Sequence, residues 1–150
     1  MRYILPPTTH RVFLRTDPLC NADIRNKTIR NLRLYKNCDT DEMTERIREL
    51  SLEWDTERIL EVNFALLTIF SSYLGIRTSR WWLYLTGIVG IFLLQHALYG
   101  WCPLLPLLRK WGIRTEKEIY DEKASLKVLR KDFEKEYHSM EELLNIVEKQ

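Results

Sequence analysis

The middle of this 150-residue chain lacks acidic side chains. The chain has 21 Asp and Glu residues, yet none lies between Val62 and Thr115. An unpaired carboxylate is costly in lipid, so burial of this segment in a membrane accounts for the gap. The whole chain is nearly balanced, with 23 basic residues and a formal net charge of +2. This balance, without a basic run that contains aromatic residues, argues against nucleic acid as a partner.

Cysteine is also scarce. Cys20, Cys38 and Cys102 are an odd number of thiols without CxxC spacing, which excludes a disulfide framework and a zinc knuckle. The three histidines are too scattered for a metal site. Walker, Rossmann, HExxH and hydrolase-elbow motifs are absent from the sequence. We therefore predict no cofactor and no metal, and an enzyme is the less favoured class.

Against these absences stand two long apolar runs. Trp81 to Trp101 carries no formal charge, and a helical rise of about 1.5 Å per residue sets its terminal tryptophans about 30 Å apart, the thickness of a bilayer core. Ile59 to Ile76 is also apolar, and only residues 77–80 separate the two runs. We predict membrane spans at about 59–76 and 81–100 that form an antiparallel helical hairpin.

The flanks are charged and predict helices in water. The predicted fold is an all-α membrane protein with an N-terminal arm at 1–38, an amphipathic helix at 39–54, the hairpin with an interfacial segment at 55–115, and a C-terminal helix at 116–150. In the arm, Arg11 to Leu14 resembles a strand, and a short helix begins at Asn21 or Asp23. Asp55 or Thr56 caps the first span. The helix at 39–54 has one apolar stripe, formed by Met43, Ile47, Leu50 and Trp54.

The C-terminal helix carries an apolar seam with a seven-residue repeat. The seam consists of Ile119, Leu126, Phe133, Met140 and Val147. This pattern predicts an amphipathic or coiled-coil helix that pairs with another copy, with the helix at 39–54, or with another protein. A second capping signature, Ser139 with Glu142, allows a break near His138.

Aromatic and basic residues mark the expected membrane boundaries. The predicted interface anchors are Trp81, Trp82, Trp101, Arg109, Lys110 and Trp111. Seven basic residues lie close to the outer ends of the hairpin, against Arg77 and Arg80 at its tip. The positive-inside rule therefore predicts that both termini are cytoplasmic.

The stretch from Gly100 to Thr115, Gly-Trp-Cys-Pro-Leu-Leu-Pro-Leu-Leu-Arg-Lys-Trp-Gly-Ile-Arg-Thr, follows a two-span hairpin. In this position it resembles the end of the YgaP-like transmembrane domain, a small multi-pass domain of the bacterial inner membrane. The resemblance covers about residues 54–115 and implies a hairpin that dimerises. Some members fuse the hairpin to a sulfur-carrying rhodanese domain. The 53 residues before this hairpin are too few for one, so sulfur transfer is not implied.

Two polar features of the hairpin are candidate sites. Cys102 lies beside basic residues at the lipid boundary, where a thiol with a lowered pKa would act as a persulfide or redox acceptor. The alternative is that Cys102 is a small apolar residue that fills space at a helix break. Glu61 and His96 occupy similar depths in the two spans, with Asn63 and Gln95 nearby. They form either a pH-responsive pair or, more simply, a polar layer that sets the hairpin register.

Small residues offer sites of close helix packing. Gly75 lies on the first span, and Gly87 and Gly90 lie on the second. Packing within one hairpin and pairing between two chains explain these residues equally well.

The favoured function is that of a non-enzymatic membrane anchor that forms a homodimer or higher oligomer and presents cytoplasmic helices to a protein partner. The alternatives are a thiol or sulfur relay through Cys102 and a small pore or transporter subunit.

Overall fold

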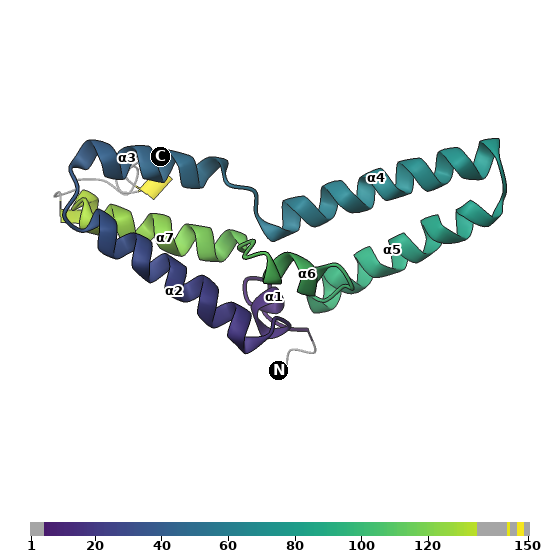
Figure 1. Cartoon of the computed structure of the whole chain (residues 1–150), viewed down its shortest axis with the longest axis horizontal. Helices are drawn as coiled ribbons and strands as arrows, with labels where there is room; N and C mark the ends of the chain where they lie inside the picture. The colour runs from purple at the N-terminus through teal and green to yellow at the C-terminus, as the bar shows by residue number, and fades with distance from the viewer. Residues whose placement is uncertain (1–4, 135–143, 145–146, 149–150) are drawn as a thin grey trace. The chain divides into compact units, whose positions relative to one another are not determined.

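The computed structural model describes residues 5–134, 144, 147 and 148 (Figure 1). Within these ranges the chain forms helices and no strand, which confirms the predicted all-α class. Two compact units are present. The hairpin unit comprises Met1–Ala22 and Trp54–Thr115, and the three-helix unit comprises Asp23–Glu53 and Glu116–Gln150.

Two long antiparallel helices, α4 (Thr56–Arg77) and α5 (Trp81–Tyr99), lie side by side in the hairpin unit (Figure 1). The Arg58 N–H donates to the Asp55 carboxylate at 2.6 Å, so Asp55 caps α4. Asp55 is one of the two residues predicted for this role. The turn between the helices is tight because the Thr78 and Ser79 N–H groups both donate to the Leu74 carbonyl.

The outer surface of the hairpin is apolar. Both long helices have the length and apolar composition to cross a membrane. Only 22% and 11% of the residues in their most apolar windows are buried. Ile69 and Ile91, near the middle of the two helices, are 67% and 64% exposed. A helix in the core of a soluble protein covers such side chains, whereas lipid covers them in a membrane.

The two long helices pack through small and hydroxyl side chains. A Cβ atom built on Gly75 would lie 2.5 Å from Leu83, so α5 approaches α4 too closely there for a larger residue. One turn earlier, the Ser71 and Thr86 hydroxyls share a 2.7 Å hydrogen bond. Leu60, Phe64 and Val89 form the apolar core nearer the other end.

The end of the hairpin opposite the tip, called the base here, is covered by two short helices. The helices are α6 (Leu105–Lys110) and α1 (Arg11–Leu14). Val12 of α1 and Leu105 of α6 are buried in the hairpin core. The strand-like run Arg11 to Leu14 is helical, because a run of four residues does not distinguish a strand from a helix that packs on a neighbour.

Three helices, α2 (Pro18–Tyr35), α3 (Thr40–Leu52) and α7 (Glu116–Leu129), form the other unit, and the first turn of α2 belongs to the hairpin unit. The α2 helix begins earlier than the predicted Asn21 or Asp23, since proline suits a first helical position. Asp39 caps α3 by accepting the Thr40 N–H at 2.7 Å. The core contains Ile47 and Leu50 of α3 and Ile119 and Leu126 of α7.

The helix predicted over 116–150 ends early. After Leu129, Lys131 adopts a φ of 64°, and a short 3-10 helix follows at Asp132–Glu134. The Arg130 guanidinium donates twice to the Asp132 carboxylate, at 2.8 and 2.6 Å, and this local ion pair holds the bend. The helix that carries the predicted seam is therefore interrupted after Leu129. Met140 and the break near His138 lie outside the described residues.

Candidate functional site

Polar contacts gather at the base of the hairpin, where the chain enters α4 and leaves α6. The Thr56 N–H donates to the Arg114 carbonyl at 2.8 Å, and the Thr56 hydroxyl donates to the same oxygen at 2.9 Å. Thr56 is fully buried. These two bonds join residues that are far apart in the sequence and close the hairpin unit at its base.

Arg11 attaches α1 to the base. One terminal nitrogen of its guanidinium donates to the Ala97 carbonyl at 2.8 Å, and the other pairs with the Glu57 carboxylate at 3.0 Å. Gly100 makes this approach feasible. Its φ is 72°, and a Cβ atom there would lie 2.5 Å from the Arg11 carbonyl carbon. Glycine is required at this position for both its left-handed backbone and its missing side chain.

His96 lies beneath this contact. The His96 side chain is buried, with 5% of the residue exposed, and neither ring nitrogen has a hydrogen-bond partner among the described residues. Glu61 is exposed, so the predicted Glu61 to His96 pair is absent from the described contacts. Glu57, one helical turn earlier, lies on the Arg11 side instead. The depth of a residue in its span, which the sequence gives, does not specify the rotation of α4 about its axis.

The two amides predicted near His96 make no contact with it. The Asn63 side chain donates to the Ile59 carbonyl of its own helix at 2.8 Å and is exposed. Gln95 is half-buried. No polar layer that includes Glu61, Asn63 and Gln95 is present among the described contacts. The polar contact between the spans is instead the hydroxyl pair of Ser71 and Thr86.

Cys102 is fully buried, at 0% exposure, in the hairpin core with Val12 and Leu105. Burial raises the pKa of the Cys102 thiol above its ordinary value, although backbone N–H groups of Leu105 and Leu104 act against this. A sulfur or redox acceptor needs a thiolate that reagents can reach. The geometry therefore favours the apolar-filler interpretation.

Arg109 does not reach the headgroups, which corrects its predicted role as an interface anchor. Only 1% of the residue is exposed, and its guanidinium donates to the Ile113 carbonyl and to the Asn21 side-chain oxygen, both at 2.9 Å. The α6 helix turns this side chain inward, toward the first turn of α2. Lys110 and Trp111, the next two residues, are exposed.

The predicted aromatic anchors lie mostly on the surface. Trp81, Trp101 and Trp111 are exposed. Trp82 is half-buried and packs edge-on against Phe70 of α4, with 6.3 Å between ring centroids. Their contact with headgroups stays a prediction.

The three candidate glycines divide into two kinds. Gly75 packs within the hairpin against Leu83. Cβ atoms built on Gly87 and Gly90 would meet nothing within 4 Å. The hairpin itself therefore has no need of glycine at these two positions.

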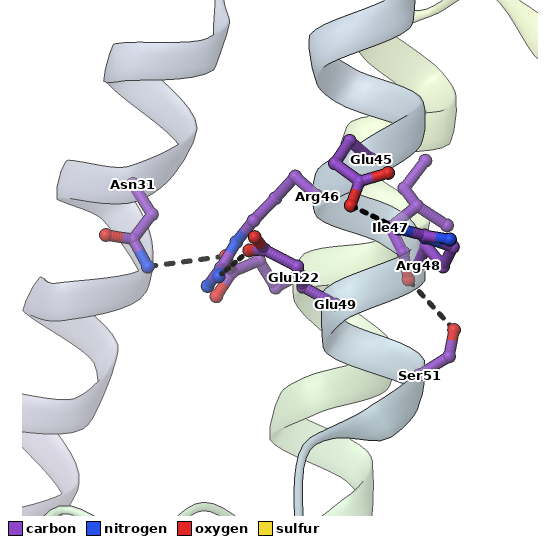
Figure 2. A network of polar contacts seen from close by, with 8 residues as sticks. All are labelled: Asn31, Glu45, Arg46, Ile47, Arg48, Glu49, Ser51 and Glu122. Carbon is purple, nitrogen blue, oxygen red and sulfur yellow. Dashed lines mark hydrogen bonds and ion pairs between the residues drawn. The ribbon is translucent and has the colours of Figure 1, made fainter.

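A second polar cluster lies in the three-helix unit and was not predicted. Figure 2 shows the Glu122 carboxylate of α7 between Asn31 of α2 and Arg46 of α3. Glu122 is fully buried and lies 3.1 Å from an Arg46 terminal nitrogen and 3.3 Å from the Asn31 amide nitrogen. The spacing of Ile119, Glu122 and Leu126 puts this acid on the apolar seam, a signal that the sequence already contained.

The cluster is matched by an exposed pair on the same helix. Arg48, two residues after Arg46 on α3, pairs with Glu45 at 2.6 Å on the surface (Figure 2). Burial acts to lower the pKa of Arg46, but the hydrogen bonds that Arg46 donates to the Glu49 and Glu122 carboxylates outweigh it and raise that pKa. Arg46 is therefore held as a cation against Glu122.

The comparison with protein families gives one match. Residues 55–118 match the model described as the inner membrane protein YgaP-like, transmembrane domain. This match confirms the resemblance seen in the sequence. Neither a curated protein nor a solved structure matches the chain. The matched range begins at the Asp55 cap and includes both long helices, Gly100 and the Arg114 carbonyl that binds Thr56.

Proposed function

We propose that this integral membrane protein is a self-associating anchor that presents a helical unit in water for protein interaction. The membrane part is the segment 55–118, which matches the YgaP-like transmembrane domain. The anchor pairs with a second copy in the plane of the bilayer. The three-helix unit offers its outer faces to a protein partner.

The observation that carries self-association is the difference between the glycines. Gly75 already has its packing partner within the hairpin. Gly87 and Gly90 leave α5 without side chains at two positions on its outer surface. Backbones approach closely in lipid at such positions, which favours pairing between chains over packing within one.

The test is association of the full chain in lipid vesicles, measured by energy transfer between donor-labelled and acceptor-labelled copies. Wild type is expected to show transfer that falls on dilution with lipid. The double variant Gly87→Leu with Gly90→Leu is expected to lose it, while the control pair Ile88→Leu with Ile91→Leu keeps it. A wild-type chain that shows no specific transfer at any lipid dilution contradicts the proposal.

The proposal includes an orientation with both termini in the cytoplasm of a bacterial cell. Arg77 and Arg80 are the only basic residues at the tip, and more basic residues flank the base. Fusion of a reporter at each end is expected to place both on the cytoplasmic side. Reporters on opposite sides contradict the hairpin, and both on the outer side contradict the orientation alone.

The two other functions remain weaker hypotheses. A thiol relay is opposed by the burial of Cys102. A pore would require several copies, because the exposed Glu61 and Asn63 lie on the outside of a single hairpin. Ion flux in vesicles that contain the purified chain distinguishes a pore from an anchor.

A further inference from the structure

The α2 helix carries a concentration of positive charge that the whole-chain balance hides. Residues 24–38 contain no acid. Five basic residues lie in this stretch: Arg25, Lys27, Arg30, Arg33 and Lys36. A chain with a net charge of +2 therefore contains one short stretch, residues 24–38, with a formal charge of +5.

Four of the five cations lie on exposed positions of α2, and Lys36 directly follows its last residue, Tyr35. Ile24 of α2 is buried, and Leu32 and Tyr35 pack against the core of the three-helix unit. All five basic residues are exposed. Leu34 lies among them, one helical turn after Arg30, and is 66% exposed. We call this surface, the five cations with Leu34, the cationic face.

The cations of the cationic face have no acidic partner within the part of the chain that the structure describes. None of the five forms an ion pair with another residue of the described ranges. Elsewhere in the same unit, Arg48 pairs with Glu45 and Lys117 pairs with Asp121. Repulsion among five neighbouring cations is relieved when an anionic surface covers them.

We propose that the cationic face binds the anionic phospholipid headgroups of the membrane that holds the hairpin. The α2 helix begins at Pro18, inside the hairpin unit, so its cations are tethered close to a bilayer surface. Each basic residue near an anionic membrane strengthens binding about fivefold. The exposed Leu34 adds an apolar group that reaches past the headgroups.

Nucleic acid is the other polyanion that a cationic helix can bind. The membrane is favoured because the covalent link to the hairpin limits how far the face can move from a lipid surface, so the effective concentration of that surface is high. The face also lacks an aromatic side chain that would stack on bases.

The experiment uses the full chain in nanodiscs of zwitterionic phosphatidylcholine, with or without anionic phosphatidylglycerol. A nitroxide is attached at Leu34→Cys after Cys20 and Cys38 are changed to serine; Cys102 is buried and remains. A nickel chelate on a small fraction of headgroups accelerates the relaxation of any nitroxide at the membrane surface. A nitroxide at Asp41→Cys, exposed on α3, is the matched control.

Anionic lipid is expected to increase the relaxation effect at position 34 severalfold and to leave position 41 little changed. Changing all five cations to glutamine should abolish the increase, whereas exchanging arginines for lysines and lysines for arginines should preserve it. Raising the salt from about 0.1 M to about 1 M shortens the Debye length from about 10 Å to about 3 Å and should also abolish it.

The proposal is overturned if position 34 relaxes equally in both lipids, or if the glutamine variant responds like wild type. It is also overturned if duplex DNA binds wild type in neutral nanodiscs, with the glutamine variant losing that binding, while anionic lipid has no effect on position 34. This proposal is tested separately from self-association. The variant with Gly87→Leu and Gly90→Leu is expected to lose energy transfer and to keep the response of position 34 to anionic lipid.

Discussion

The hairpin unit and the three-helix unit arrange polar and apolar side chains in opposite ways. In the three-helix unit, Ile47 and Leu126 lie inside and most charges lie outside. In the hairpin, Ile69 and Ile91 lie outside, while Ser71 and His96 lie inside. The same chain therefore folds by two rules, because lipid does not drive apolar side chains inward as water does.

Each unit also solves the problem of polar groups in its interior differently. The hairpin uses hydroxyl groups, which satisfy each other at short range. The three-helix unit buries a full charge at Glu122 and places Arg46 against it. A buried ion pair tolerates the loss of neither partner, so the three-helix unit has the more fragile polar contact.

The largest expected effect comes from breaking that ion pair. Arg46→Ala takes a cation away from a carboxylate that has no exposed surface, and should destabilise the three-helix unit by about 3 to 5 kcal/mol. Hydrogen–deuterium exchange of the α3 and α7 amides measures this in nanodiscs. The control, Arg48→Ala, removes an exposed pair and should change stability by less than about 1 kcal/mol. Equal effects would show that the buried cluster is not special.

A pair of isoleucine substitutions tests the inside-out comparison itself. Ile47→Ala opens a cavity in the core of the three-helix unit and should destabilise that unit by about 2 to 5 kcal/mol. Ile91→Ala shortens a lipid-facing side chain and should change hairpin stability by about 0.5 kcal/mol or less. Exchange protection in each unit reports the two values. A large loss at Ile91 would place that residue in a protein core rather than in lipid.

The membrane part of this fold was predictable from the sequence, because the bilayer sets the length of its elements. The gap in acidic residues, the two apolar runs and the four-residue connection together specify a hairpin, and the structure has α4 and α5 there. The Asp55 cap followed from its position before the first span.

The contacts at the base were not predictable, because they depend on rotation and on segments distant in sequence. Arg109 was expected at the headgroups, but the six-residue α6 turns it toward Asn21. The positions of Glu61 and His96 along the two spans predict a pair, but Glu57 is the acid that faces α1. No periodicity reveals that α1 would lie on Gly100.

The glycine at the end of α5 offers a test of the close packing of α1 at the base of the hairpin unit. Gly100→Ala meets both a positive φ and the Arg11 backbone, and should destabilise the base by about 2 to 4 kcal/mol. Gly112→Ala has a similar φ of 76° with open space, and should lose only about 1 to 2 kcal/mol. Faster exchange of the α1 amides is expected in the first variant only. Equal exchange of the α1 amides in both variants would contradict the close approach of α1 to Gly100.

A smaller effect is expected inside the membrane. Ser71→Ala removes the 2.7 Å hydrogen bond to Thr86, and should weaken the hairpin by about 0.6 to 2 kcal/mol. Ser72→Ala removes only a 3.4 Å contact with the same hydroxyl and should have less effect. Unfolding of the hairpin in detergent titrations gives both values. If Ser72→Ala has the larger effect, the assignment of the hydroxyl pair is wrong.

The smallest effect concerns alkaline pH. Because burial raises the pKa of the Cys102 thiol above 9.0, the folded state holds its proton more tightly than the unfolded state does. This contribution to stability is complete below pH 9 and is lost as the pH rises through the folded pKa. Cys102→Ala should therefore show a flatter stability profile above pH 9 than wild type. A steeper profile in the variant would reverse the sign of the pKa shift.

The most direct test of the membrane hairpin is to identify what covers the outer side chains of α4 and α5. Nitroxides at Ile69→Cys and Ile91→Cys, with Asp41→Cys on α3 as the aqueous reference, are exposed in turn to oxygen, which partitions into lipid, and to a water-soluble nickel complex. If α4 and α5 lie in lipid, oxygen will dominate the relaxation of the nitroxides at positions 69 and 91, and nickel will dominate at position 41. Nickel access at 69 and 91 equal to that at 41 would contradict the membrane hairpin.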